Sequence, residues 1–237
     1  MALSIFGIHG NSSSPAIFSK LKTPLLSCLN LPGHVNDRSP NPASDYSVEG
    51  ISTFVKNQLL DERDYILLGN SLGGHLAIEI AADLQGCLGT VLFGTPPVRK
   101  PLNMEEAFHP HELLNIYLQG AYDEEMLNKA VDAMTMNKSI SDLLISDFKA
   151  TDPLFRDNWM ASVGAGSLKD EVIEVENLEM PVFVVHGKHD PFINLEYIKS
   201  LKGIEEIFVM ENSSHYPCLE HPEEFDKIVE TILSKIN

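Results

Sequence analysis

Residues 65 to 80 read YILLGNSLGGHLAIEI, and this stretch changes character in the middle. Its first half is an apolar run typical of a buried strand, and its second half has the apolar spacing that favours a helix. Gly69, Ser71 and Gly73 form a G-x-S-x-G pattern at the junction. Such a turn presents the serine oxygen outward at the positive end of a helix dipole. The stretch therefore predicts a nucleophile at Ser71, with an ordinary serine-capped turn as the alternative.

Short apolar runs alternate with helix-like segments along most of the chain. We predict strands at residues 3–8, 25–29, 65–68, 88–93, 182–186 and 206–210, and helices at 48–60, 72–84, 195–201 and 223–236. Strands that are apolar on both faces suit a parallel sheet covered by helices on each side. The predicted fold class is α/β, with a doubly wound, mostly parallel sheet of about six strands.

Residues 97–178 interrupt this alternation. They contain no convincing strand, and helical patterns occur at 112–119, 123–134 and 139–148. We interpret this segment as a helical cap insertion on a core formed by residues 1–96 and 179–237. Its methionine and aromatic side chains are expected to pack the insertion onto the core, and a lid over an apolar pocket is the alternative.

A serine nucleophile needs a base, and the base needs an acidic partner that orients it. The sequence VFVVHGKHDPF places Asp190 just after one predicted strand, and IFVMENSSHYP places His215 just after the next. Their order, Ser then Asp then His, is the order found in α/β-hydrolases. Because sites in open α/β sheets lie at the carboxyl ends of strands, we expect Ser71, Asp190 and His215 to meet at one edge.

The developing oxyanion of an acyl-transfer reaction needs backbone N–H donors. Leu72 follows the nucleophile directly and is the first predicted donor. The loop in IHGNSSS follows the first strand and makes Asn11 the second, with Ser12 close behind. A plain strand-ending turn at His9 and Gly10 is the alternative.

Composition limits the remaining classes of function. The chain has 237 residues and a formal net charge of -17, which disfavours nucleic acid and anionic membrane surfaces as partners. No apolar stretch approaches the roughly 20 residues that span a bilayer, and the N-terminus lacks the features of a signal peptide. Cys28, Cys87 and Cys218 fit neither a disulfide framework nor a zinc site. We therefore expect a cytoplasmic protein.

Several histidines and serines have other interpretations. His186 and His189 with Asp190 resemble metal-ligand spacing, but no further ligands surround them, so we predict neither a metal nor a cofactor. His75, one turn beyond Ser71, is interpreted as a partly buried side chain with its hydrogen bonds satisfied. His221 is expected to mark the start of the last helix, and Ser213 and Ser214 to shape the approach to His215.

Over nearly its whole length the chain resembles the α/β-hydrolase superfamily, and most closely the branch that contains N-acyl homoserine lactonases. The matching stretches are HGNSSSPAIF, LPGH, YSVEG, NSLGGHLAIEI, GTPPV, SVGAG, DPF and HYPCLEHPEEFD. The resemblance implies a triad of Ser71, Asp190 and His215, an oxyanion hole at Asn11 and Leu72, and a cap in the middle of the chain. Because the chain begins at the strand before His9, the N-terminal strand pair of the superfamily is expected to be absent.

These observations predict a cofactor-independent serine hydrolase of a small ester or lactone, with an N-acyl homoserine lactone as the favoured substrate. One alternative is hydrolysis of a C–C bond in a ring-cleavage product. Such substrates usually carry carboxylates, for which the cap region offers few cations, chiefly Arg99, Lys100 and Arg156. Another alternative is a ligand-binding protein that retains the hydrolase fold and turns over slowly. The oligomeric state is left open.

Overall fold

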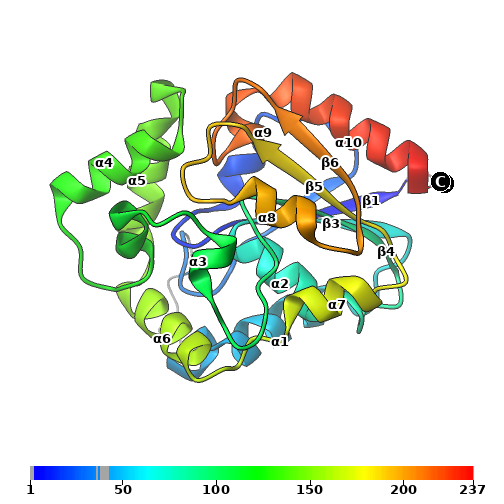
Figure 1. Ribbon diagram of the computed structural model, residues 1–237, viewed down its shortest axis with the longest axis horizontal. Coiled ribbons are helices and arrows are strands. Elements are labelled where there is room, and N and C mark those ends of the chain that lie inside the picture. The colour runs from blue at the N-terminus through cyan, green and yellow to red at the C-terminus, as the bar shows by residue number, and fades with distance from the viewer. Residues whose placement is uncertain (1–2, 36, 38–42, 237) are drawn as a thin grey trace.

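A parallel sheet forms the centre of the molecule. The computed structural model describes residues 3–35, 37 and 43–236. Its six strands lie in the order β2-β1-β3-β4-β5-β6, and each neighbouring pair is parallel (Figure 1). The strands are β1 (Ser4–Ile8), β2 (Leu26–Leu29), β3 (Tyr65–Asn70), β4 (Cys87–Phe93), β5 (Val182–Gly187) and β6 (Ile204–Met210). The predicted fold class is confirmed.

The strand order reverses between β1 and β3, which are neighbours in the sheet. From β1 the chain moves outward to β2 at one edge, and then returns to β3 on the other side of β1. Ile8 at the end of β1 is paired in register with Gly69 near the end of β3. The loops that follow these two strands therefore lie next to each other at the carboxyl edge, the usual place for a site in an open sheet.

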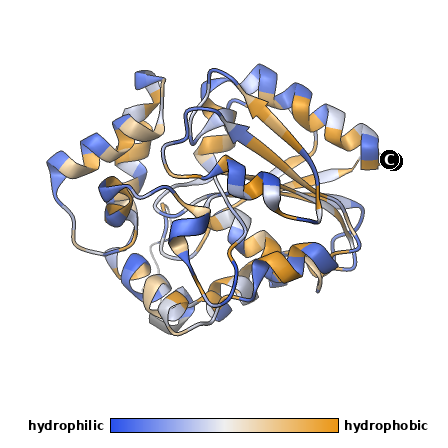
Figure 2. Cartoon of the chain, viewed as in Figure 1, coloured by the Kyte–Doolittle hydropathy of each residue, from blue (hydrophilic) through white to orange (hydrophobic). Residues whose placement is uncertain are grey.

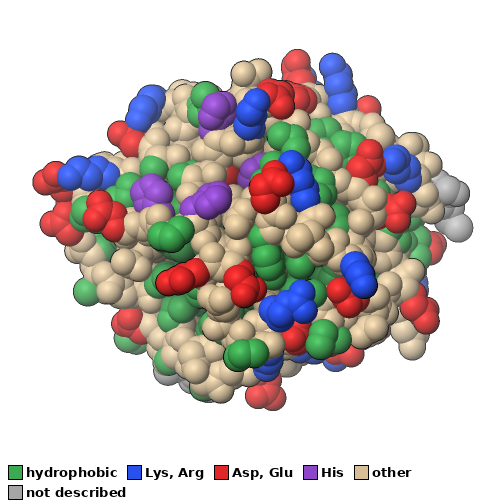
Figure 3. Space-filling model, in the orientation of Figure 1, with side chains coloured by type: hydrophobic (Ala, Val, Ile, Leu, Met, Phe, Trp, Pro, Cys, Tyr) green, Lys and Arg blue, Asp and Glu red, His purple; other side chains and the backbone are tan. Residues whose placement is uncertain are grey.

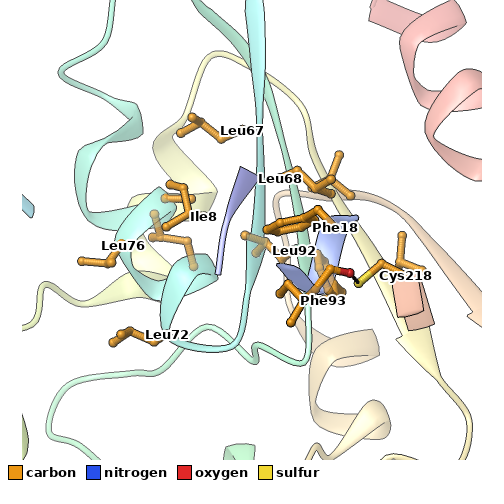
Figure 4. Packing of buried hydrophobic residues seen from close by; sticks show 14 of the residues in the cluster. Ile8, Phe18, Leu67, Leu68, Leu72, Leu76, Leu92, Phe93 and Cys218 are labelled. Carbon is orange, nitrogen blue, oxygen red and sulfur yellow. Dashed lines mark hydrogen bonds between the residues drawn. The ribbon is translucent and has the colours of Figure 1, made fainter. Parts of the chain in front are cut away.

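Helices cover both faces of the sheet (Figure 1). The helices α1 (Val48–Leu59), α2 (Leu72–Ala81) and α7 (Glu171–Asn177) lie on one face, and α10 (Pro222–Ile236) lies on the other. Because strand side chains alternate, Leu67 and Leu68 of β3 point to opposite sides (Figure 4). On the α10 side, the Phe93 ring packs edge-on against Phe225 of α10, with a centroid distance of 5.1 Å. The long surface helix α10 carries hydrophobic and hydrophilic residues on different sides (Figure 2).

The helix predictions for the core agree with the structure. Residues 48–60, 72–84, 195–201 and 223–236 correspond to α1, α2, α8 (Leu195–Ser200) and α10. Ser47 caps α1 by accepting a hydrogen bond from Gly50 N at 3.0 Å, and Pro222 begins α10. Three shorter elements complete this part of the fold: η1 (Pro15–Phe18), η2 (Ala43–Tyr46) and α9 (Pro217–Glu220).

The segment between β4 and β5 is helical where it has regular structure. It contains α3 (Met104–Ala107), η3 (Glu112–Tyr117), α4 (Glu124–Met134), η4 (Lys138–Ile140), α5 (Ser141–Ala150), α6 (Pro153–Gly164) and α7. The helix predicted at 112–119 is a 3-10 helix, and neither α6 nor α7 was predicted. The last of these, α7, packs against α2 beside the sheet. Within the described part of the chain, no helix is long and apolar enough to cross a membrane.

Candidate active site

Ser71 lies at a sharp turn between β3 and α2. Its backbone has φ 50° and ψ -116°, a conformation that costs free energy for a residue with a side chain. Two hydrogen bonds hold it there: Ser71 N donates to Phe93 O at 2.9 Å, and Thr95 Oγ1 donates to Ser71 O at 2.8 Å. The adjacent strand β4 and the loop after it thus hold the backbone of Ser71 in its strained conformation.

Close backbone packing explains the glycines around Ser71. A Cβ atom on Gly69 would lie 2.6 Å from Gly73 O, and one on Gly73 would lie 2.0 Å from Ile8 O. Neither distance can be accommodated, since both contacts are with backbone atoms. The G-x-S-x-G pattern therefore reflects two places where helix α2 approaches the sheet too closely for any side chain.

Asp190 and His215 are joined by a hydrogen bond after β5 and β6. His215 Nδ1 donates to Asp190 Oδ2 at 2.7 Å, and Phe192 N donates to Asp190 Oδ1 at 3.0 Å. Burial raises the pKa of the Asp190 carboxyl, but His215 and the Phe192 N–H lower it by more, so the pKa lies below its ordinary value. The pair therefore holds a carboxylate against the imidazole, which leaves Nε2 of His215 as the ring nitrogen able to accept a proton.

One small cavity brings these predicted residues together. Ser71 and His215 both line a space of about 40 Å³, together with Asn11 and Phe192. Gly94 also lines it, and a Cβ atom there would lie 2.7 Å from His215 Cε1. Among the described residues no hydrogen bond joins Ser71 to His215, although such bonds are often long before substrate binds.

The two predicted oxyanion donors also face this region. Asn11 and Leu72 line a second cavity with Ser71, about 100 Å³ in volume. In the described part of the structure, neither backbone N–H donates to a protein acceptor. The Asn11 side chain is already used, because its Nδ2 donates to Tyr117 O at 2.6 Å and its Oδ1 accepts from Ser12 Oγ at 3.0 Å. The backbone N–H groups thus remain available to a substrate.

Two buried histidines support the loop that carries Asn11. Leu31 N donates to His9 Nε2, and Ser12 N donates to His34 Nε2, each at 3.1 Å. The other ring nitrogens face the carbonyl oxygens of Gly10 and Pro32, so in both rings Nδ1 carries the proton and Nε2 accepts. Burial lowers the pKa of His9 to about 4 and the pKa of His34 well below its ordinary value. Both rings are therefore neutral acceptors near neutral pH.

Sequence reasoning did not identify Arg156 as part of this support. The residue is 1% exposed, and its guanidinium donates to Ser12 Oγ at 2.9 Å, Gln119 O at 2.9 Å and Gly120 O at 3.2 Å. It also lies 4.2 Å from the centre of the Phe148 ring. Arg156 thus links helix α6 to the loop beside Asn11, and no local pattern indicates this contact.

Glu220 is a second residue that sequence reasoning missed. Its Oε2 accepts from Ser213 Oγ at 2.7 Å and Ser214 N at 2.6 Å, just before His215. Its Oε1 accepts from Thr135 Oγ1 at 2.9 Å and Met136 N at 2.5 Å, just after α4. This buried carboxylate therefore ties the His215 loop to the helical segment. Ser213 and Ser214 supply the hydrogen bonds from the His215 loop to Glu220.

The larger cavity is mainly apolar. Its lining includes Phe108, Leu114, Trp159 and Met160, all from the segment between β4 and β5, and it includes His75 of α2. On the face drawn in Figure 3, hydrophobic side chains occupy the middle, with acidic and basic side chains around them. No cluster of three or more metal-ligating side chains occurs within residues 3–35, 37 and 43–236.

Comparison with known proteins identifies the family. A model described as the alpha/beta hydrolase family matches residues 5–228. The chain belongs to this family. It is 22% identical to monoacylglycerol lipase abhd6-A of Xenopus laevis, over 98% of this chain and 76% of that protein. It is 25% identical to 2-hydroxymuconate semialdehyde hydrolase of Pseudomonas putida, over 71% of this chain and 62% of that protein.

Solved structures of similar fold include a lactonase. N-acyl homoserine lactonase AidH, complexed with N-butanoyl homoserine, has a TM-score of 0.87 and 26% identity, with 100% of this chain and 90% of that chain covered. A mutant of AidH complexed with N-hexanoyl homoserine lactone has a TM-score of 0.86 at 26% identity, over 99% and 91%. A putative aryl esterase from Burkholderia cenocepacia has a TM-score of 0.79 at 20% identity, over 99% and 91%, and supports the fold alone.

Proposed function

We propose that this protein is a serine hydrolase that cleaves a small ester or lactone through an acyl-enzyme and needs no cofactor. Ser71 is the proposed nucleophile, His215 the general base and Asp190 the residue that orients the imidazole. One observation carries the proposal: the strained Ser71 lines the same cavity as His215, whose Nδ1 is held by the buried Asp190. Family membership agrees with a hydrolase.

The reaction follows from the position of each proton. His215 Nε2 takes the proton of Ser71 Oγ as this oxygen attacks the carbonyl carbon, and Asp190 stabilises the imidazolium that forms. When the tetrahedral intermediate collapses, the C–O bond of the ester breaks and His215 returns the proton to the leaving oxygen. In a lactone that oxygen stays attached to the acyl group as a hydroxyl. A water activated by His215 then cleaves the acyl-enzyme and releases the acid.

Charge on the carbonyl oxygen is stabilised by the N–H groups of Asn11 and Leu72. Removal of one such donor costs on the order of 100-fold to 1000-fold in rate. The support of the Asn11 loop by His34 and Arg156, through Ser12, fits this role because an oxyanion donor acts best when it is held in place before reaction. The position of Leu72 follows directly from the Ser71 turn.

An N-acyl homoserine lactone is the favoured substrate within this proposal. The support is the 26% identity to AidH over 100% of the chain, together with the apolar lining of the larger cavity, which suits an acyl chain. Residues 97–178 are proposed as the cap that selects the substrate, since they supply most of that lining. A cytoplasmic location remains part of the proposal and rests on three cysteines that are all free thiols.

Hydrolysis of a C–C bond is a weaker alternative. It is favoured by the 25% identity to 2-hydroxymuconate semialdehyde hydrolase. However, Arg156 is buried and bonded to Ser12 and to backbone carbonyls, and it lines neither cavity that contains Ser71. Arg99 and Lys100 are exposed and line an outer hollow that shares Val98, Leu102, Val163 and Leu168 with the larger cavity but does not include Ser71. A carboxylate on the substrate would therefore find neither an arginine nor a lysine among the lining residues of the two cavities that contain Ser71.

The test is a pH-indicator assay of N-acyl homoserine lactones of several chain lengths and of simple aryl esters. We expect turnover of at least one class, and its loss in Ser71→Ala. Ser52→Ala is the matched control, because Ser52 Oγ in α1 is buried without a partner and lies away from the site. Activity that persists in pure Ser71→Ala would refute the nucleophile assignment.

The same assay separates an enzyme from a slow binding protein. A kcat well below about 1 per second on every ester and lactone, despite tight binding, would favour a ligand-binding protein. Turnover of aryl esters with none of lactones would remove the favoured substrate and leave the mechanism intact. Turnover of a ring-cleavage product in preference to both would favour the C–C hydrolase.

A further inference from the structure

His75 is the first titratable residue of α2 after Ser71. It lines the larger cavity together with Ser71 and Leu72. It lies one helical turn beyond Ser71, which corresponds to about 6 Å along the helix axis. The triad and the oxyanion donors do not use it. A ligand whose carbonyl carbon is at Ser71 and whose chain occupies the larger cavity would therefore pass His75 within a few bonds.

Glu171 fixes the orientation of the imidazole. His75 Nδ1 donates to both Glu171 oxygens, at 2.8 Å to Oε1 and 2.9 Å to Oε2. Glu171 is itself fully buried, and its Oε2 also accepts from Val98 N at 2.8 Å. The carboxylate is thus anchored to the loop after β4, and it holds the ring of His75 in one position.

The second ring nitrogen of His75 is left for a ligand. Among the described residues, no protein atom forms a hydrogen bond with His75 Nε2. This nitrogen is not fully buried either, so it is accessible to a ligand. Burial lowers the pKa of His75, but Glu171 and Glu79 raise it by more, so the pKa lies above its ordinary value. This favours the imidazolium, in which Nε2 carries a proton to donate.

Few polar side chains line this cavity. Besides Ser71 and His75 they are Asn11, whose side chain is already bonded, and Tyr117, whereas Phe108, Leu114, Trp159 and Met160 offer mainly hydrophobic contact. In mainly apolar sites, a small number of placed polar groups fixes the orientation of the ligand and provides specificity. Nε2 of His75 is positioned to do this for the part of the ligand next to the reacting carbonyl.

We propose that His75 is a substrate-specificity residue whose Nε2–H donates a hydrogen bond to a second carbonyl oxygen, such as an amide oxygen, a few bonds from the carbonyl attacked by Ser71. This inference rests on the proposed function and narrows it to acyl compounds that carry such an acceptor. An ester or lactone with only hydrocarbon beside the reacting carbonyl leaves Nε2–H without a partner in the cavity, and it binds less tightly.

The test measures binding, so that it does not depend on turnover. Trp159 is the one tryptophan of the chain and lines the same cavity, so its fluorescence reports occupancy. Dissociation constants are measured in Ser71→Ala for N-hexanoyl homoserine lactone and for an α-alkyl-γ-butyrolactone of equal length that lacks the amide. We expect the amide lactone to bind about 10-fold or more tightly, as for a hydrogen bond to a charged group.

This preference is expected to disappear in Ser71→Ala/His75→Leu. Because that change leaves the buried Glu171 without its partner, a second protein adds Glu171→Gln, whose side-chain oxygen can still accept from Val98 N. Leu102→Ala is the control: Leu102 is an apolar lining residue, and its loss should weaken both lactones alike.

Equal affinity of the two lactones for Ser71→Ala would overturn the inference, as would absence of binding by both or a preference that survives in the His75→Leu proteins. Hydrolysis by the unaltered protein is measured separately. An amide preference that depends on His75, without any hydrolysis of lactones or esters, would refute the proposed function and retain His75 as the residue that recognises the ligand.

Discussion

Acidification is expected to destabilise the protein through His9 and His34, the two buried histidines beside the Asn11 loop. Each ring is neutral, and its Nε2 accepts a backbone N–H. Protonation would place a second donor against that N–H and would put a charge in a site with no exposure to solvent. The unfolded chain pays neither cost, so it binds protons more readily.

The magnitude follows from the two pKa values of His9, 6.5 in the unfolded chain and about 4 in the fold. Because the pKa of His9 is lower in the folded state, the unfolded state binds more protons below pH 6.5. The free energy of unfolding therefore decreases as the pH is lowered, until the pH reaches the folded pKa. Between about pH 7 and about pH 4.5, His9 alone removes about 2 kcal/mol of unfolding free energy. His34, whose pKa burial also lowers well below its ordinary value, adds to this loss.

The assay is urea unfolding followed by the fluorescence of Trp159 at a series of pH values. Comparison with His9→Gln/His34→Gln isolates the two histidines, because carboxylates titrate equally in both proteins. Glutamine can still accept the two N–H groups but binds no proton in this range. The variant should be less stable near neutral pH and lose at least about 2 kcal/mol less on acidification. Parallel loss of stability in both proteins would refute the reasoning.

Two further substitutions test the support of the site. Arg156→Met should lower kcat by about 10-fold or more, because Ser12 Oγ and the carbonyls of Gln119 and Gly120 lose their donor and the Asn11 N–H is less firmly held; an unchanged kcat per active site, counted by titration, would contradict this. Gly73→Ala should prevent folding, since its Cβ would lie 2.0 Å from Ile8 O. Gly164→Ala, with no atom within 4 Å of its Cβ, is the control and should be neutral or stabilising by about 0.5–1 kcal/mol in thermal unfolding.

Much of the fold follows from local pattern. The six strands and the helices α1, α2, α8 and α10 were predicted within a few residues, because each is a run whose periodicity and end signals lie within the run itself. The same is true of the turn at Ser71, where glycine spacing reflects close contact with the next element. The segment between β4 and β5 is harder to predict. In α6 the buried stripe of Phe155, Arg156, Trp159 and Val163 contains a charged arginine, and Leu154 is 54% exposed, so the apolar stripe that normally marks a helix is blurred.

Local sequence also predicted that the proposed site residues lie at one edge of the sheet. Ser71, Asp190 and His215 each follow a parallel strand, and parallel strands end together, so their proximity could be predicted. Their roles stay a prediction until activity is measured. The contact of Asp190 with His215 spans 25 residues, yet it needs only that β5 and β6 be neighbours.

Other partners were decided by the tertiary structure alone. Arg156 meets Ser12 across 144 positions, and His75 meets Glu171 across 96. Each of these polar side chains is unremarkable within its own segment, and burial is what requires it to find a partner. Which partner it finds depends on how the helices after β4 pack over the sheet. The sequence by itself thus predicted that Ser71, Asp190 and His215 follow strands that end at one edge of the sheet. Only long-range packing decided what holds Asn11, His215 and His75 in place, because those hydrogen bonds join segments with no local relation.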